Sequence, residues 1–341
     1  MKHKIGLLGF GTVGQGLCEI LLNKKEFLKK KYGFKFDIVA VADFKFGNVY
    51  NAKGLDIEKM IKEAKAGKKF TQDLADWDNL KLIKKSNTTV WCELTYTDLN
   101  TGGPAIDHVK TALKSGKHVV TSNKGPAALF YPQMKKLADK NGVKFKIEGT
   151  VVAGTPVINL AEGPLAGCTI SKIRGILNGT TNYMLTEMEK GMAYDEVLKV
   201  AQEKGYAEAD PTGDVEGYDA RGKVTILANI VMGAGIKITD VPCNGITKIK
   251  PADIEKAKKQ NKRWKLIGSV EMIDGKVEAS VKPEMIDLSH PLAGVMGATN
   301  ALTFTTDLLG DVTIVGPGAG KIETGFSILT DLLSISREME N

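Results

Sequence analysis

Cysteine is scarce in this sequence, with four residues among 341, and no two of them form a Cys-x-x-Cys pair. This spacing excludes a zinc ribbon and a thioredoxin-type redox motif. So low a cysteine content in a chain of this length is typical of a reducing compartment, and we expect a cytoplasmic protein. The four are Cys18, Cys92, Cys168 and Cys243.

Long hydrophobic runs are also lacking. After Lys2 and Lys4 the chain enters a short strand pattern directly, without the long apolar region and small-residue cleavage site of a signal peptide. The longest apolar stretch, residues 224–236, contains threonine and asparagine and is too short to cross a bilayer. We therefore expect no membrane partner.

A concentrated basic stripe is absent as well. Although 47 Lys and Arg against 40 Asp and Glu give a net charge of +7, the basic residues are spread among many acids. The densest run, from Lys24 to Lys31, follows an apolar helix pattern, which favours a solvated helix end over a nucleic-acid site. With 43% hydrophobic and 26% charged residues the chain is typical of globular proteins, and its length favours two domains.

The first half alternates short apolar runs with helical patterns, which predicts βαβ units and a parallel sheet. Residues 37–43 form a nearly continuous apolar run, as in a strand that is covered on both faces. The lysine-rich stretch 57–80 has a helical, exposed pattern, and we interpret it as an insertion at the rim of the sheet. The predicted strands are 4–9, 37–43, 89–94, 118–122 and 143–147, and the predicted helices are 11–23, 105–115 and 127–141.

The pattern changes after Gly149, where strands surround helices without regular alternation. This mixture predicts an α+β domain on an open sheet. Segment 312–337 has the pattern of a strand, a glycine turn and a helix that returns to the first domain, so we predict domains at 1–148, completed by about 312–341, and at 149–311. In this second half the predicted strands are 169–174, 265–273, 276–281 and 301–306, and the predicted helices are 183–189, 194–203 and one from about Tyr218.

A glycine triplet stands where the first predicted strand meets the first helix. It reads Gly9, Phe10, Gly11, Thr12, Val13, Gly14. The first glycine permits a tight turn, the second lets the backbone approach a pyrophosphate, and the third allows close helix–strand packing. Because the helix N-terminus adds unpaired N–H groups for the phosphates, the triplet predicts a Rossmann-type dinucleotide site in an α/β domain rather than a merely structural turn.

An acidic residue is expected at the end of the second strand, and Asp43 stands there. It follows Gly14 by 29 residues, against about 20 in the standard spacing, and we assign the excess to a lysine-rich loop at 24–35. A carboxylate at Asp43 favours the free ribose hydroxyls of NAD, whereas Lys45 could accept the 2′-phosphate of NADP. The sequence leaves both cofactors open.

Four later segments resemble those of homoserine dehydrogenases, in the same order, and the resemblance extends over nearly the whole chain. They are 121–124 (TSNK), 148–156 (EGTVVAGTP), 178–183 (NGTTNY) and 205–223 (GYAEADPTGDVEGYDARGK). Ser122 departs from the usual alanine or proline, and the late glycine run reads GPGAG at 316–320. The chain resembles the catalytic unit alone, without the regulatory extension or fused kinase of some relatives, so we expect less threonine inhibition.

Asp219 and Lys223 lie four residues apart in a predicted helix, so their side chains meet on one face. From this pattern alone, an exposed ion pair that contributes a few tenths of a kcal/mol is an equal alternative to a site. The preceding acids can also partly compensate the helix dipole. These acids are Glu208, Asp210, Asp214 and Glu216.

The resemblance implies reversible, NAD(P)-dependent hydride transfer between L-homoserine and L-aspartate 4-semialdehyde, in threonine, methionine and isoleucine biosynthesis. It makes Lys223 the general acid and base, and Asp219 its partner or a ligand of the substrate. Glu208 would hold the substrate's ammonium group, with Asp214 also at the substrate. Lys124 would lie near nicotinamide and substrate; otherwise it is a surface lysine in a loop.

The same resemblance assigns the cofactor and a cation. A monovalent cation, Na+ or K+, would bind oxygen ligands between Glu148 and Thr155, where the alternative is a rigid hinge between domains. It would be held by the Glu148 carboxylate and the carbonyls of Val151, Ala153 and Thr155. The glycine triplet and Asp43 would be joined at the cofactor by Leu94, Thr95, Thr121, Lys124, Gly205 and Gly320.

Three other interpretations remain at this point. Aspartate-semialdehyde dehydrogenase needs a nucleophilic cysteine beside a histidine, and no cysteine here has such a setting. A dinucleotide sensor without chemistry would not need Glu208, Asp219 and Lys223 together. Another amino-acid-pathway oxidoreductase of the same architecture is the third. Family precedent further implies a homodimer, formed through the second, substrate-binding domain, and the expected partner is a small-molecule substrate.

Overall fold

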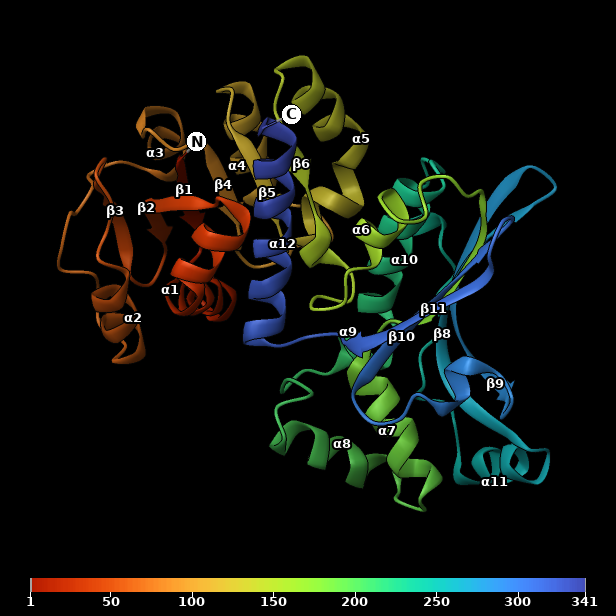
Figure 1. The fold of residues 1–341 in the computed structure, drawn as a ribbon. Coiled ribbons are helices and arrows are strands. Elements are labelled where there is room, and N and C mark those ends of the chain that lie inside the picture. The colour runs from red at the N-terminus through yellow and green to blue at the C-terminus, as the bar shows by residue number, and fades with distance from the viewer. Residues whose placement is uncertain (1, 341) are drawn as a thin grey trace. The chain divides into compact units, whose positions relative to one another are not determined.

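The computed structural model describes residues 2–340, and the chain divides into two compact units (Figure 1). The first unit contains the chain up to Gly154 together with the segment from Gly320 onward, and the second is Thr155–Ala319. Both boundaries fall a few residues after the predicted ones. The reasons are local: η1 (Glu148–Thr150) contacts β5 and α12 of the first unit, and β11 (Gly310–Pro317) pairs with β10 in the second.

The first unit is built on a six-stranded sheet of order β3-β2-β1-β4-β5-β6. All neighbouring strands pair in parallel except β3, which lies antiparallel to β2 at one edge. The predicted parallel sheet is confirmed. The strands are β1 (Lys2–Leu8), β2 (Lys35–Asp43), β3 (Gly47–Tyr50), β4 (Val90–Glu93), β5 (His118–Thr121) and β6 (Phe145–Lys146), and the helices are α1 (Thr12–Tyr32), α2 (Ile57–Lys65), α3 (Asn79–Lys85), α4 (Ala105–Lys114), α5 (Lys124–Lys140) and α12 (Lys321–Glu340).

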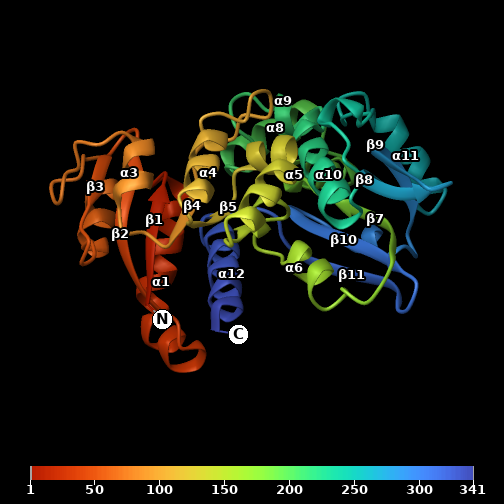
Figure 2. The ribbon, with the colours of Figure 1, turned by 90° about the horizontal axis from the view of Figure 1, so that it is seen from above.

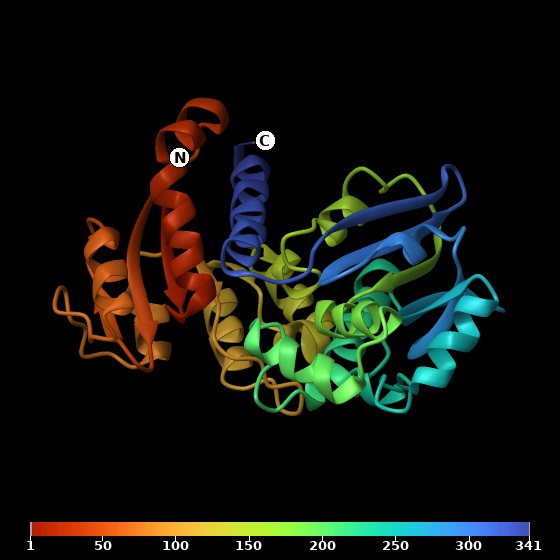
Figure 3. The same cartoon turned by 90° about the horizontal axis from the view of Figure 1, so that it is seen from below.

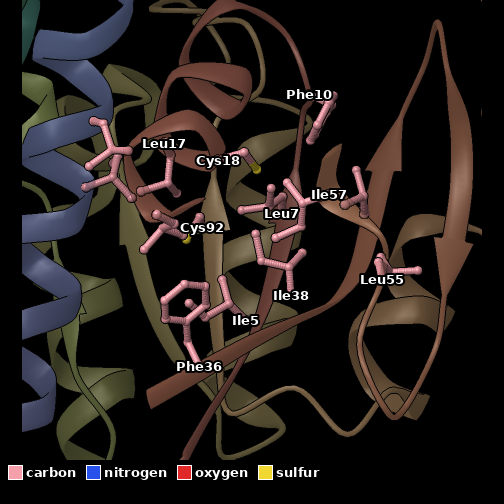
Figure 4. Close-up of a cluster of buried hydrophobic side chains, with 14 of the residues drawn as sticks. Ile5, Leu7, Phe10, Leu17, Cys18, Phe36, Ile38, Leu55, Ile57 and Cys92 are labelled. Atoms are coloured by element: carbon pink, nitrogen blue, oxygen red, sulfur yellow. The ribbon is translucent and has the colours of Figure 1, made fainter. Parts of the chain in front are cut away.

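A single large cluster of apolar side chains fills one side of this sheet. Ile5 and Leu7 of β1, Ile38 of β2 and Cys92 of β4 meet Leu17 of α1 there, all of them buried (Figure 4). Side chains from strands that lie far apart in sequence thus share one core, which is what a parallel sheet covered by helices requires.

Helix α1 is longer than predicted, and the proposed loop at 24–35 is wrong. The helix continues to Tyr32 because lysine is a good helix former and Leu28, buried, extends its apolar face. Gly33, with φ 64°, then ends it in a left-handed cap. The helix end is solvated, with the Nζ atoms of Lys24 and Lys31 above the ring of Phe27.

The lysine-rich stretch 57–80 lies at the rim of the sheet, where Leu74 forms a bridge with the edge strand β3, but it is helical only in α2 and from Asn79 onward. It is also not exposed throughout, because α2 buries Ile57, Met60 and Ile61 against the core. Strand β3 was not predicted because its four residues, Gly47–Tyr50, lie in a hairpin with β2 and carry no strong alternation.

Helix α12 returns to the first unit and packs along α1 (Figure 3). The two helices meet at glycines: a Cβ on Gly325 would lie 2.7 Å from the backbone nitrogen of Leu17, and a Cβ on Gly16 would collide with the carbonyl of Lys321. Residues without side chains therefore let the backbones touch. The buried face of α12 adds Ile328, Leu329, Leu332 and Ile335 to the core.

The second unit is built on a five-stranded antiparallel sheet of order β11-β10-β7-β8-β9 (Figure 2). Helices α7, α10 and α11 contact its strands, so the predicted α+β arrangement on an open sheet is confirmed. Its elements are α6 (Val157–Glu162), β7 (Ile170–Ile176), α7 (Gly179–Glu189), α8 (Tyr194–Glu203), α9 (Thr212–Val215), α10 (Tyr218–Val231), η2 (Ile238–Asp240), α11 (Pro251–Lys259), β8 (Lys262–Ile273), β9 (Lys276–Asp287), η3 (Pro291–Gly294), β10 (Thr299–Thr306) and β11. Within residues 2–340, no helix is both long enough and apolar enough to cross a membrane.

Candidate active site

The glycine turn after β1 has the geometry that its sequence predicts. Gly9 has φ 96°, and a Cβ there would lie 2.7 Å from the carbonyl oxygen of Leu94. A Cβ on Gly14 would lie 2.6 Å from the carbonyl oxygen of Gly9, so the third glycine brings helix and turn into contact. A Cβ on Gly11, by contrast, would meet none of the described atoms within 4 Å, which leaves the backbone open to a ligand.

The position of this turn in the sheet favours ligand binding. β1 lies between β2 and β4, so the strand order reverses beside it, and ligands of open parallel sheets bind at the carboxyl ends of such strands. α1 begins with Thr12 and Val13. Its N-cap residue, Gly11, has no side chain that could accept a hydrogen bond from the first backbone N–H groups of the helix. Backbone N–H groups at this helix end are therefore suited to phosphate oxygens.

Asp43 closes the turn from the end of β2. Its Oδ2 accepts a hydrogen bond of 2.6 Å from the backbone nitrogen of Phe10. Its Oδ1 accepts hydrogen bonds of 2.8 and 3.0 Å from the backbone nitrogens of Lys45 and Phe46. The carboxylate thus holds two turns together as well as standing at the predicted ribose position. Lys45 Nζ lies 5.3 Å from the ring centroid of Phe46.

The other predicted cofactor residues of the first unit gather at the carboxyl ends of β4 and β5. Leu94 packs against the core beneath the glycine turn, and Thr95 follows it. The hydroxyl of Thr121, fully buried, donates to the carbonyl of Glu93 at 2.6 Å. Lys124 opens α5 and is half-buried.

The second unit places Lys223 inside the protein. Its side chain is only 9% exposed, and Nζ donates to Asp219 Oδ2 and to the carbonyl of Leu177, both at 2.7 Å. Because Lys223 is buried and Asp219, on the same helix α10, is only partly exposed, the alternative of an exposed ion pair is wrong. A buried amine with one carboxylate and one carbonyl is a suitable proton-transfer group.

Asn178 connects this pair to a second carboxylate. Its Nδ2 donates to Asp214 Oδ1 at 2.7 Å and to Asp219 Oδ2 at 3.0 Å, while its Oδ1 accepts from the backbone nitrogen of Thr181 and so caps α7. Burial raises the pKa of Asp214 against the hydrogen bond from Asn178, and the charge of Asp219 adds to the rise. Sequence reasoning missed this role, although an asparagine before a helix is a capping signal.

The remaining predicted residues of the second unit lie between α8 and α9. Gly205, with φ 72°, follows α8, and Glu208 is exposed. The carbonyl of Glu208 accepts a bond of 3.1 Å from Gln202 Nε2. In the part of the chain that the structure describes, Asn178 joins Asp214 to Asp219, and Asp219 in turn binds Lys223. The Glu208 side chain contributes no hydrogen bond to this cluster.

The segment from Glu148 to Thr155 is tightly held. Glu148 is buried and its backbone nitrogen donates to Asp331 Oδ2 at 2.9 Å. Val152 has φ 50°, a strained conformation for a β-branched residue, between the buried Val151 and Ala153. Among residues 2–340, no three His, Cys, Asp or Glu side chains gather as a metal site. Gly320, with φ 142°, leads into α12.

The cysteines have no setting that activates a thiolate. Cys18 and Cys92 are fully buried, and burial raises the pKa of both thiols; burial also raises the pKa of Cys243. Thiols of this kind are poor nucleophiles, which disfavours a cysteine-dependent semialdehyde dehydrogenase.

Comparison with known proteins finds two family models that together match most of the chain. The family model for homoserine dehydrogenase matches residues 156–333, and the model for the homoserine dehydrogenase NAD binding domain matches residues 9–148. Over 338 residues the chain is 44% identical to an NAD(+)-dependent homoserine dehydrogenase of Pseudomonas canavaninivorans, covering 98% of this chain and 96% of the relative.

Two further relatives are similar over nearly their full length. A homoserine dehydrogenase of Methanocaldococcus jannaschii is 43% identical and covers 96% of this chain, which spans 97% of that relative. The structure of a hyperthermophilic archaeal homoserine dehydrogenase in complex with NADPH superposes with a TM-score of 0.85 at 29% identity, covering 99% of this chain and 98% of that one.

Proposed function

This chain belongs to the homoserine dehydrogenase family, and we propose that it interconverts L-homoserine and L-aspartate 4-semialdehyde in threonine, methionine and isoleucine biosynthesis. The glycine turn of the first unit binds the dinucleotide. The observation that carries the proposal is the buried Lys223 amine, bonded to Asp219 and to the carbonyl of Leu177. A family fold without such a group could bind a cofactor but could not move the hydroxyl proton.

Each residue of the cluster has a separate task in this proposal. The bound nicotinamide supplies the hydride acceptor in homoserine oxidation and the hydride donor in the reverse reaction. Lys223 takes the proton of the homoserine hydroxyl during oxidation and returns it to the carbonyl oxygen during reduction. Asp219 orients Lys223, Asp214 and Glu208 hold the polar groups of the amino acid, and Lys124 serves the nicotinamide end of the substrate.

We infer that NAD is the preferred cofactor. A carboxylate at the end of β2 repels a 2′-phosphate and binds ribose hydroxyls, and Asp43 stands there. The relative from Pseudomonas canavaninivorans is NAD(+)-dependent, whereas the archaeal structure holds NADPH. Asp43→Asn removes the charge and keeps one of the two acceptor oxygens, so it also loses either the hydrogen bond from the Phe10 backbone nitrogen or those from Lys45 and Phe46, a loss that affects both cofactors alike. It should raise kcat/KM for NADP+ relative to NAD+; an unchanged ratio would count against this role of Asp43.

We also propose a monovalent cation, Na+ or K+, on oxygen atoms of the Glu148–Thr155 segment. Its ligands would be the Glu148 carboxylate and the carbonyls of Val151, Ala153 and Thr155, a hard-ligand set that fits a hard ion. The buried Glu148 supplies the charge, and the strained backbone at Val152 fits carbonyls turned for ligation. Exchange into tetramethylammonium salts should lower the melting temperature of the wild type but not of Glu148→Gln. Equal melting temperatures of the wild type in both salts would contradict the proposed cation site.

The central experiment follows nicotinamide absorbance while the protein is incubated with L-homoserine and NAD+ or NADP+. We expect absorbance to rise with homoserine and NAD+, and to fall with the semialdehyde and NADH. Cofactor binding without turnover in either direction would instead indicate a dinucleotide sensor. We expect a cytoplasmic homodimer, which light scattering after gel filtration tests.

A further inference from the structure

A chain of polar side chains runs beneath the carboxyl ends of β2 and β4. It begins at the backbone nitrogen of Asp43, which donates to Asn48 Oδ1 at 3.2 Å. Asn48 Nδ2 donates to Asn79 Oδ1 at 3.2 Å, and Asn79 Nδ2 lies 3.2 Å from His108 Nε2. His108 Nδ1 lies 2.7 Å from Glu93 Oε2. The chain therefore connects the ribose end of the glycine turn to the end of β4.

The order of donors along this chain is determined by its ends. Asp43 presents an N–H, so Asn48 must turn its oxygen toward it, and Asn48 Nδ2 also donates to the carbonyl of Trp77 at 2.8 Å. Asn79 then offers its NH2 group to His108. Nε2 of His108 accepts that bond, and the ring proton lies on Nδ1, where it is donated to Glu93.

Glu93 is the far end of the chain and is completely buried. Its Oε2 faces His108, and its Oε1 accepts from both the backbone nitrogen, at 2.9 Å, and the hydroxyl of Thr95. A buried carboxylate that lost one of these donors would keep an unsatisfied charge. The carboxylate therefore fixes the conformation of Thr95.

A second asparagine extends the same arrangement to β5. Asn123 Nδ2 donates to the carbonyls of Thr95 and Tyr96 at 3.1 and 2.7 Å, and its Oδ1 caps α5 at Gly125. The turns after β2, β4 and β5 are thus linked by side chains that lie beneath them. None of the sequence motifs above includes Glu93, His108, Asn48 or Asn79.

We propose that Glu93 and His108 are positioning residues for the nicotinamide cofactor. They hold Thr95, and through Asn79 and Asn48 the backbone of Asp43, in the conformation that receives the dinucleotide. This inference rests on the proposed cofactor site of the first unit. It differs from a purely stabilising role, because it predicts that breaking the chain changes cofactor affinity more than it changes the fold.

Two substitutions at His108 separate its two bonds. His108→Asn places an NH2 group near the position of Nδ1 and keeps the donor to Glu93, whereas His108→Gln keeps an acceptor for Asn79 and loses that donor. We expect the Kd and KM for NAD+ to rise about tenfold in His108→Gln and less than threefold in His108→Asn, with the KM for homoserine unchanged in both. Glu93→Gln places an NH2 group where the carboxylate accepts hydrogen bonds from His108 and Thr95. It should raise the Kd and KM for NAD+ as much as His108→Gln does.

His118→Gln is the matched control. His118 is a buried histidine at the opposite end of the same sheet, where its Nδ1 accepts from the backbone nitrogen of Lys144 at 3.0 Å. It should lower the melting temperature while leaving the Kd for NAD+ unchanged. The inference is overturned if His108→Gln and Glu93→Gln bind NAD+ as tightly as wild type, or if His118→Gln weakens binding equally. Wild-type turnover of homoserine in the same assay separates this outcome from failure of the proposed function.

Discussion

The proposed sites of the two units are built from different chemical groups. In the first unit the turn at Gly9, Gly11 and Gly14 offers backbone N–H groups, and what matters is the absence of side chains. In the second unit, Lys223, Asp219 and Asn178 form a cluster of charged and polar side chains that satisfy one another. A site built from backbone groups is disturbed only by substitutions that add atoms to it. A site built from side chains is expected to fail when one functional group is removed.

The largest expected effect is at Lys223. Lys223→Ala removes the proposed acid and base and should lower kcat for homoserine oxidation about a hundred- to ten-thousand-fold, with the Kd for NAD+ nearly unchanged. Lys190→Ala is the matched control, because Lys190 also pairs with an acid on its own helix turn but is exposed. An active Lys223→Ala enzyme would refute the assignment, and a loss of activity in Lys190→Ala would show that the measurement is not specific.

A smaller effect, on binding rather than on chemistry, is expected at Gly11. A Cβ there meets no described protein atom within 4 Å, so Gly11→Ala should cost less than about 1 kcal/mol of unfolding free energy. It should nevertheless raise the Kd for NAD+ about tenfold, because the methyl group occupies space that the pyrophosphate needs. Gly167→Ala, also without described neighbours within 4 Å, is the control and should bind NAD+ normally. Equal binding by both variants would contradict a backbone-built site.

The smallest expected effect is on stability, at the ion pairs of Glu338 with Lys144 and Lys146. Burial raises the pKa of Glu338, but hydrogen bonds from Lys144 and Lys146 outweigh burial and lower the pKa to about 2. Since the folded-state pKa is depressed, the stabilisation is complete above pH 4.5 and is lost as the pH falls toward 2. Glu338→Gln should therefore cost about 0.5 kcal/mol at pH 7 and progressively less in acid, as measured by urea unfolding at several pH values. A cost that grew in acid would contradict this pairing.

The same contrast explains which features could be predicted from the sequence. The glycine turn could be predicted because it depends on local spacing, and the parallel strands of the first unit could be predicted because their apolar runs are continuous. The link from Lys223 to the carbonyl of Leu177 could not be predicted from the sequence, because it joins residues 46 positions apart whose contact depends on how α10 packs against β8 and β9. Asn178 was part of a noticed motif, yet its two carboxylate partners become visible only in three dimensions.

The errors in the first unit have a related cause. The lysines of α1 and α2 led us to expect that these segments are exposed to solvent. Each helix also carries apolar residues, such as Leu28 and Met60, that pack into the core. Charge on one face of a helix does not exclude burial of the other. Strand β3 forms because it pairs with β2, and such a tertiary interaction cannot be predicted from its four residues alone.

The return of α12 to the first unit has a consequence for synthesis. Ile328, Leu329, Leu332 and Ile335 complete a core whose other buried members lie within residues 5–120, so that core stays unfinished on the ribosome until α12 has emerged. Every residue of the second unit is available before then. The unit encoded later can consequently complete its folding first, which reverses the usual N-terminal-first order of nascent chains.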